Sequence, residues 1–178
     1  MIDLRSDTLT LPTQEMRNVI AHVIVGDDCY GEDGSVVELE EYCKQLFCVE
    51  DALFVATGTM ANQLAIKSQV TEGNEVITET NYHINFYESS SIAMLSRAVL
   101  HTCRTEDGIL RVEHVDELIH SKPRGSFYAY PQLVSIENTI NYYQGKYFLL
   151  KKSNNCMSSR ERRTYLYIWM EQGCFMHT

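Results

Sequence analysis

The chain has 178 residues, of which 44% are hydrophobic, so it is long enough to build one globular domain with a buried core. Its formal net charge of −9 argues against a nucleic-acid or an anionic-membrane surface as its partner. Residues 1–7 hold neither an apolar run nor a basic leader, and no stretch has the length of a membrane span, so we expect a cytoplasmic protein.

The N-terminal third of the sequence predicts two helices separated by a polar loop. Pro12 suits a first helical turn and opens a helical stretch over residues 13–24. Residues 26–34 are rich in turn formers and predict a loop. Ser35, with Glu38 three residues later, has the pattern of a capping box, so we expect Ser35 to cap the second helix.

Short apolar runs then alternate with helical stretches. The runs predict strands at 52–56, 75–78, 98–102 and 132–136. Helical periodicity or composition predicts helices at 60–70, 92–97 and 112–120. This alternation indicates an α/β fold with a largely parallel sheet. After residue 151 neither a clear period nor a capping signal predicts a regular element.

A turn between the apolar run 52–56 and the next helix carries the first candidate site. Thr57, Gly58 and Thr59 fall where a helix begins. Unpaired N–H groups and the helix dipole favour an anion there, and glycine lets the backbone come close. On these residues alone, simple helix capping is the more economical interpretation.

Cysteines and histidines give no sign of a metal site or a disulfide framework. None of the six cysteines forms a Cys-x-x-Cys pair, and the six histidines show no metal-ligand spacing. We therefore expect no bound metal.

Five motifs in register resemble the threonine aldolase family, which are pyridoxal 5′-phosphate (PLP) enzymes of the fold-type I, aspartate aminotransferase-like superfamily. The motifs are residues 3–8 (DLRSDT), 26–33 (GDDCYGED), 54–63 (FVATGTMANQ), 83–88 (HINFYE) and 133–139 (LVSIENT). The resemblance covers residues 1–148 without large gaps. It implies part of the large domain of that fold, a three-layer α/β/α arrangement.

The resemblance also implies roles for the matched residues. Thr57, Gly58 and Thr59 would hold the cofactor phosphate. His83 would stack on the pyridine ring and lie near the substrate hydroxyl, as the catalytic residue. Ser6 would approach the substrate carboxylate, and the loop of Tyr30 would reach the site of a neighbouring subunit, because family members form dimers and tetramers. Glu88 and Asn138 would support the pocket, although a purely structural role fits them equally well.

The implied reaction is a retro-aldol cleavage of a small amino acid. A base removes the β-hydroxyl proton, the Cα–Cβ bond breaks, and the PLP ring accepts the electrons, so that threonine or allo-threonine gives glycine and acetaldehyde. Another fold-type I lyase acting on a β-substituted amino acid stays open, because a fold does not fix a substrate. A non-catalytic fragment that associates with intact subunits is the alternative from a different class.

The sequence departs from the family after residue 148. The family has an Asp-Gly-Ala-Arg stretch, whose Asp pairs with the pyridine nitrogen, and later a Ser-Lys-Gly-type stretch with the Schiff-base lysine. Neither stretch occurs here, so we expect the chain to be inactive by itself. Ile140 also stands where the family usually has His.

Back-translation suggests why the family pattern stops. Read in a shifted frame, the codons of Trp169 and Met170 must contain GAT for Asp, and those of Met170 and Glu171 must contain GGA for Gly. Allowed codon choices extend this to Pro-x-His-Met-Asp-Gly-Ala-Arg-Leu-Phe-His-Ala. We therefore interpret residues 149–178 as a frame-shifted tail, with the change near residues 148–150; a tail of separate origin is the alternative.

Overall fold

The structure is a computed structural model that describes residues 9–123, 125–147, 166–171 and 174–176, the last two ranges as backbone. The chain divides into two compact units, Met1–Phe54 and Val55–Thr178. Within the described part of the chain, no helix is long and apolar enough to cross a membrane.

The first unit contains helices α1 (Gln14–His22) and α2 (Gly34–Phe47), with the short 3-10 helix η2 (Asp28–Tyr30) between them. Thr13 caps α1, so Pro12 precedes the cap and does not lie in the first turn. The predicted capping box at Ser35 is wrong. Asp33 is the N-cap of α2, because its carboxylate accepts hydrogen bonds from the Ser35 and Val36 N–H groups and a charged acceptor suits the helix N-terminus.

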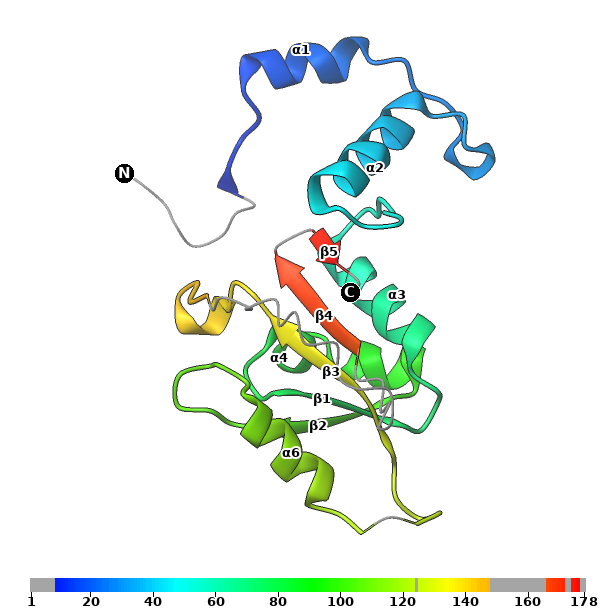
Figure 1. Ribbon diagram of the computed structural model, residues 1–178. Coiled ribbons are helices and arrows are strands. Elements are labelled where there is room, and N and C mark those ends of the chain that lie inside the picture. Colours follow the sequence, from blue (N-terminus) through cyan, green and yellow to red (C-terminus); the bar gives the residue numbers. More distant parts are fainter. Residues whose placement is uncertain (1–8, 124, 148–165, 172–173, 177–178) are drawn as a thin grey trace. The chain divides into compact units, whose positions relative to one another are not determined.

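The second unit is built on a five-stranded sheet in the order β2-β1-β3-β4-β5 (Figure 1). Its strands are β1 (Glu75–Glu79), β2 (Val99–Cys103), β3 (Pro131–Glu137), β4 (Leu166–Glu171) and β5 (Cys174–Met176). The first four in that order run parallel, and β5 pairs antiparallel with β4. The expected α/β fold with a largely parallel sheet is confirmed.

Helical segments connect these strands. They are α3 (Gly58–Gln69), α4 (His83–Phe86), α5 (Ser89–Ser91), the π-helix η3 (Ile92–Ser96), α6 (Val112–His120) and the 3-10 helix η4 (Asn141–Tyr143). The predicted helix at 112–120 has the observed bounds. The helix expected at 92–97 forms as a single π-helical turn, which Arg97 ends in the left-handed conformation.

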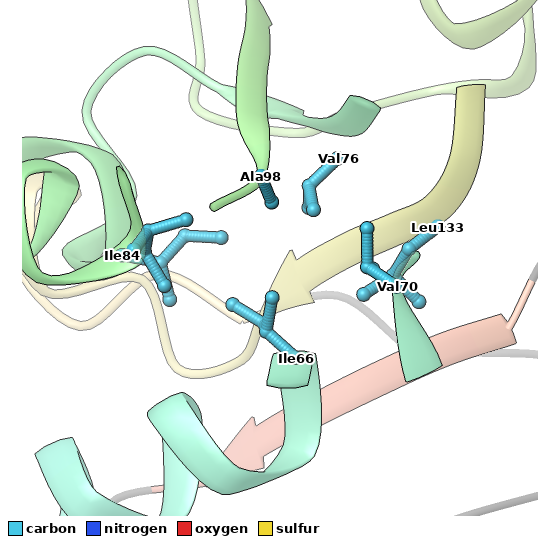
Figure 2. Close-up of a cluster of buried hydrophobic side chains, with 7 residues drawn as sticks. Ile66, Val70, Val76, Ile84, Ala98 and Leu133 are labelled. Atoms are coloured by element: carbon cyan, nitrogen blue, oxygen red, sulfur yellow. The ribbon is translucent and has the colours of Figure 1, made fainter. Parts of the chain in front are cut away.

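Two apolar clusters cover the two faces of the sheet and give three layers. One contains Ile66 of α3, Val76 of β1, Ile84 of α4, Leu133 of β3 and Ala98, which directly precedes β2; these side chains converge in Figure 2. The other gathers residues of α6, of β1 and β3 and of the connecting segments, namely Ile77, Tyr82, Leu110, Ile119, Val134, Ile136 and Ile140. Because neighbouring strand residues point to opposite faces, Val76 and Ile77 are both fully buried. Each such side chain contributes about 1.5–3 kcal/mol.

One predicted strand is wrong, and two strands form where the sequence predicted none. Residues 52–56 form no strand, because they make no ladder with any described strand and the Phe54 N–H donates to Glu40 Oε1. Conversely, the segment after residue 151 contains β4 and β5. Strand pairing is a backbone interaction, so β4 pairs with the edge of β3 without needing a sequence period.

Candidate active site

The N-terminus of α3 is exposed, as the sequence prediction of an anion site requires. Thr57 Oγ1 accepts a hydrogen bond from the Met60 N–H at 3.0 Å, which makes Thr57 the N-cap. Gly58 and Thr59 occupy the first turn, where helical N–H groups have no acceptor inside the helix. All three residues are exposed, and a Cβ added at Gly58 would meet no atom within 4 Å. An anion can therefore approach these N–H groups without obstruction.

His83 and Glu88 form an imidazole–carboxylate pair. His83 is the first residue of α4, and Glu88 immediately precedes α5. His83 Nδ1 lies 2.6 Å from Glu88 Oε1; the carboxylate is buried, whereas 35% of the imidazole is exposed. The hydrogen bond with Glu88 raises the pKa of His83 above its ordinary 6.5, and this effect outweighs burial.

Two amides of α3 complete the environment of Glu88. Asn62 Nδ2 donates to Oε1 at 2.6 Å, and Gln63 Nε2 donates to Oε2 at 2.7 Å. Burial favours a higher pKa for Glu88, but its hydrogen bonds with His83, Asn62 and Gln63 hold that pKa below its ordinary 4.5. Asn62 is four residues from Gly58, about 6 Å along the helix axis. Glu88 therefore joins His83 to the N-terminal half of α3.

Glu137, the last residue of β3, holds the backbone at the start of α4. One carboxylate oxygen accepts from the His83 N–H, and the other accepts from the Asn141 N–H at 2.8 Å. Burial raises the pKa of Glu137. Asn138 follows directly and is buried. Glu137 thus holds the first residue of α4 at the carboxyl end of β3.

The Tyr87 ring packs against His83 and belongs to a short series of aromatic contacts. The His83 and Tyr87 ring centroids are 4.8 Å apart with a 44° angle between the planes, and Phe86 contacts both Tyr87 and Tyr142. Phe86, Tyr87 and Tyr142 are each half-exposed or more. The contact with Tyr87 restricts the orientation of the imidazole.

The structure brings part of the predicted site together. Thr57, Gly58, Thr59, His83, Glu88 and Asn138 all belong to the second unit. Of these, Glu88 and His83 are joined directly, and Glu88 connects them to α3. Tyr30 lies in η2 of the first unit and is 80% exposed. Ser6 lies outside the described residues. The roles assigned to these residues stay predictions.

Asn62, Gln63 and Glu137 were not singled out from the sequence. All three stand inside quoted motifs, which was the available signal. Their partners, however, are 25 or more residues away, so only the fold reveals the hydrogen bonds. Among the residues that the structure describes, no group of three or more His, Cys, Asp or Glu side chains is arranged to hold a metal ion.

These residues fit the cofactor that the resemblance implies. An unobstructed helix N-terminus with Gly58 and Thr59 suits a phosphate monoester. A partly exposed imidazole, held by a buried carboxylate, suits a planar aromatic ring and a proton-accepting role. The fold and these contacts thus define an α/β protein with an exposed helix N-terminus and a histidine–glutamate pair joined to the same helix.

Comparison with known proteins gives the family. Residues 3–157 match the model of the beta-eliminating lyase family, and the chain belongs to this family. An uncharacterized Caenorhabditis elegans protein is 38% identical over 163 residues, which are 91% of this chain and 39% of that protein. Low-specificity L-threonine aldolase 1 of Arabidopsis thaliana is 36% identical over 140 residues, 78% of this chain and 39% of that enzyme.

A solved structure agrees with this assignment. Leishmania major threonine aldolase aligns with a TM-score of 0.60 and 26% identity, covering 71% of this chain and 36% of that one. The fold is therefore that of the threonine aldolases, in part. The chain spans about two fifths of the length of the curated relatives it matches.

Proposed function

We propose that this chain is the N-terminal portion of a PLP-dependent threonine aldolase, which cleaves L-threonine or L-allo-threonine to glycine and acetaldehyde. One observation carries the proposal: the buried carboxylate of Glu88 joins His83 to the first turns of α3, whose N-terminus is exposed. A phosphate group and a catalytic imidazole are thereby held on one rigid frame. The relatives' names and the family match support the activity.

In this proposal Thr57, Gly58 and Thr59 bind the phosphate of PLP at the N-terminus of α3. The bound cofactor supplies an electron sink for cleavage of the Cα–Cβ bond. His83 packs against the ring and accepts the proton of the substrate hydroxyl at Nε2, because its Nδ1 is occupied by Glu88. Ser6 contacts the substrate carboxylate, and Asn138 supports the pocket from the end of β3.

The proposal extends to residues 149–178, which we interpret as the same gene read in another frame. The family match ends at residue 157, before β4 begins. In the alternative frame an Asp codon overlaps those of Trp169 and Met170, which lie opposite Ile136 and Glu137 at the carboxyl end of β3. In the restored frame this Asp would therefore lie at the carboxyl end of the parallel strands, beside the end of β3 that holds the start of α4. Sequencing the transcript across the codons of residues 148–150 tests this; an intact frame without Asp-Gly-Ala-Arg in any register contradicts it.

Phosphate-dependent binding tests the proposed cofactor site on the chain itself. Pyridoxamine 5′-phosphate and pyridoxamine are suitable probes, because neither can form an imine with a surface lysine. We expect equilibrium dialysis to show tighter binding of the phosphorylated form. Gly58→Asp places a carboxylate on the same N–H groups and should weaken that binding by roughly tenfold while stabilising the helix end.

Gly34→Asp is the matched control for this substitution. Gly34 is the first residue of α2, as Gly58 is of α3, and a Cβ there also meets nothing within 4 Å. Its binding should equal that of the unmodified chain. Equal binding of both probes, or no effect of Gly58→Asp, contradicts the proposed site. Restoring the frame and assaying acetaldehyde release from threonine and from allo-threonine then separates an aldolase from another fold-type I amino-acid lyase.

The exposed apolar residues of the first unit favour a homo-oligomer. They also favour the second candidate function, a non-catalytic fragment that associates with intact subunits. Helix α1 has no buried residue, and one of its faces exposes Met16, Val19 and Ile20. The loop of Tyr30 would contact the neighbouring subunit in such an assembly. Co-purification with a full-length homologue supports this candidate, and its absence removes it.

We also place the protein in the cytoplasm. The cysteines of the described residues, Cys29, Cys43, Cys48 and Cys103, are free thiols, as expected in a reducing compartment.

A further inference from the structure

The amides of Asn62 and Gln63 point their nitrogens at Glu88, and this orientation leaves their own oxygens without partners. Asn62 Nδ2 and Gln63 Nε2 donate to the two carboxylate oxygens at 2.6 and 2.7 Å. Asn62 Oδ1 and Gln63 Oε1 are buried and accept no hydrogen bond. Two unsatisfied buried oxygens destabilise the fold, yet turning either amide over would bring its oxygen against a carboxylate oxygen. The carboxylate therefore dictates the orientation of both amides.

This arrangement makes Glu88 solely an acceptor. Each of its oxygens already accepts one N–H, so a proton on the carboxyl group would face a donor on either side. The remaining close neighbour, His83 Nδ1, must then provide a hydrogen to the carboxylate. In a neutral imidazole only one ring nitrogen carries hydrogen, so Nε2 is left with its lone pair.

We propose that Asn62 and Gln63 are positioning residues, which act through Glu88 to fix neutral His83 in the Nδ1–H tautomer and so present Nε2 as a proton acceptor. The catalytic meaning of this inference rests on the proposed aldolase function. The tautomer itself does not, because it is a property of the chain without cofactor.

Other groups near His83 do not account for the same result. Glu137 accepts from the backbone N–H of His83 and leaves the ring untouched. The Tyr87 ring packs against the imidazole with its plane tilted by 44°. The charge of Glu137 favours the imidazolium but does not select between the two neutral tautomers.

The tautomer can be measured directly on the full chain labelled with ¹⁵N-histidine. Two-bond ¹H–¹⁵N correlation spectra distinguish a protonated from an unprotonated ring nitrogen, and His83→Gln assigns the signal among the six histidines. Above the pKa of His83 we expect a single Nδ1–H form. An unrestrained imidazole favours Nε2–H, so a predominant Nε2–H signal in the unmodified chain overturns the proposal without any further variant.

Gln63→Met tests the amide clamp because it keeps the length of the side chain and removes the donor. We expect a mixture of both tautomers, and a shift of at least about one pH unit upward in the acid-side inflection of the His83 signal that reports protonation of Glu88. Asn62→Leu removes the donor to the other carboxylate oxygen of Glu88 and should have the same two effects.

Gln69→Met is the matched control. Gln69 lies on the same helix, but its amide nitrogen donates to the Ala65 carbonyl oxygen and does not reach Glu88. It should leave the tautomer and the inflection unchanged. If Gln63→Met or Asn62→Leu folds and behaves like Gln69→Met, the two amides only fill space. If instead the tautomer is fixed as proposed but the phosphorylated probe does not bind, the aldolase assignment fails while the positioning role stands.

Discussion

Replacing Glu88 with Gln perturbs the centre of the site with little change in shape. The glutamine keeps one acceptor oxygen, but its amide nitrogen must face a donor, because Glu88 accepts from Asn62, Gln63 and His83. Hydrogen bonds to a charged group contribute about 1.5–3 kcal/mol each, and an unsatisfied buried donor costs about 1–3 kcal/mol. Removing a buried charge offsets part of this. We expect Glu88→Gln to lower the free energy of unfolding by about 2–4 kcal/mol at about pH 5.5.

The loss should depend on pH in a defined way. The pKa of His83 is raised above 6.5 in the folded chain, so its contribution is full below that value and is lost as the pH rises through the folded-state pKa. The pKa of Glu88 is lowered below 4.5, so its contribution is present above that value and is lost as the pH falls through the folded-state pKa. The difference between the two proteins is therefore largest between pH 4.5 and 6.5.

Urea unfolding followed by far-ultraviolet circular dichroism at several pH values measures this difference. Glu72→Gln is the control, because Glu72 forms exposed ion pairs with Lys67 and Arg97. Such pairs are worth less than about 1 kcal/mol. A loss for Glu88→Gln as small as that of the control, or one that does not change with pH, would refute the buried network as described.

Two further substitutions probe the surroundings of the site. Gly108→Ala should lower the unfolding free energy by about 2–4 kcal/mol, because φ is +80° and the new Cβ would lie 2.4 Å from the Tyr143 ring. Gly73→Ala, with φ +85° and open space, is the control that measures the backbone strain by itself, at about 1 kcal/mol. Equal losses for the two variants in urea unfolding would contradict the close approach of Gly108 to Tyr143. Glu137→Gln should cost about 1–3 kcal/mol. Because burial raises the pKa of Glu137, that loss should shrink from about pH 4 to 7 in urea titrations, and a growing loss would contradict the assignment.

Patterns within a few residues predicted the helices and strands that depend mainly on local sequence. The amphipathic pattern of 112–120 gave α6 its observed bounds, and the helix predicted at 60–70 formed as α3, which begins two residues earlier at Gly58. The strands predicted at 75–78 and 132–136 became β1 and β3, whose central apolar residues are buried on both faces of the sheet. The same signal failed at 52–56, where an apolar run found no strand to pair with.

The sequence by itself determined the α/β class, the resemblance to the threonine aldolases and the residue types of the site. These follow from patterns within a few residues and from motif order along the chain. Tertiary structure decided which polar groups meet: that Glu88 shares its oxygens among His83, Asn62 and Gln63, and that β4 lies beside β3. A buried carboxylate accepts hydrogen bonds only from donors that the packed sheet and helices bring within about 3 Å. The separation of two residues along the sequence does not predict that distance.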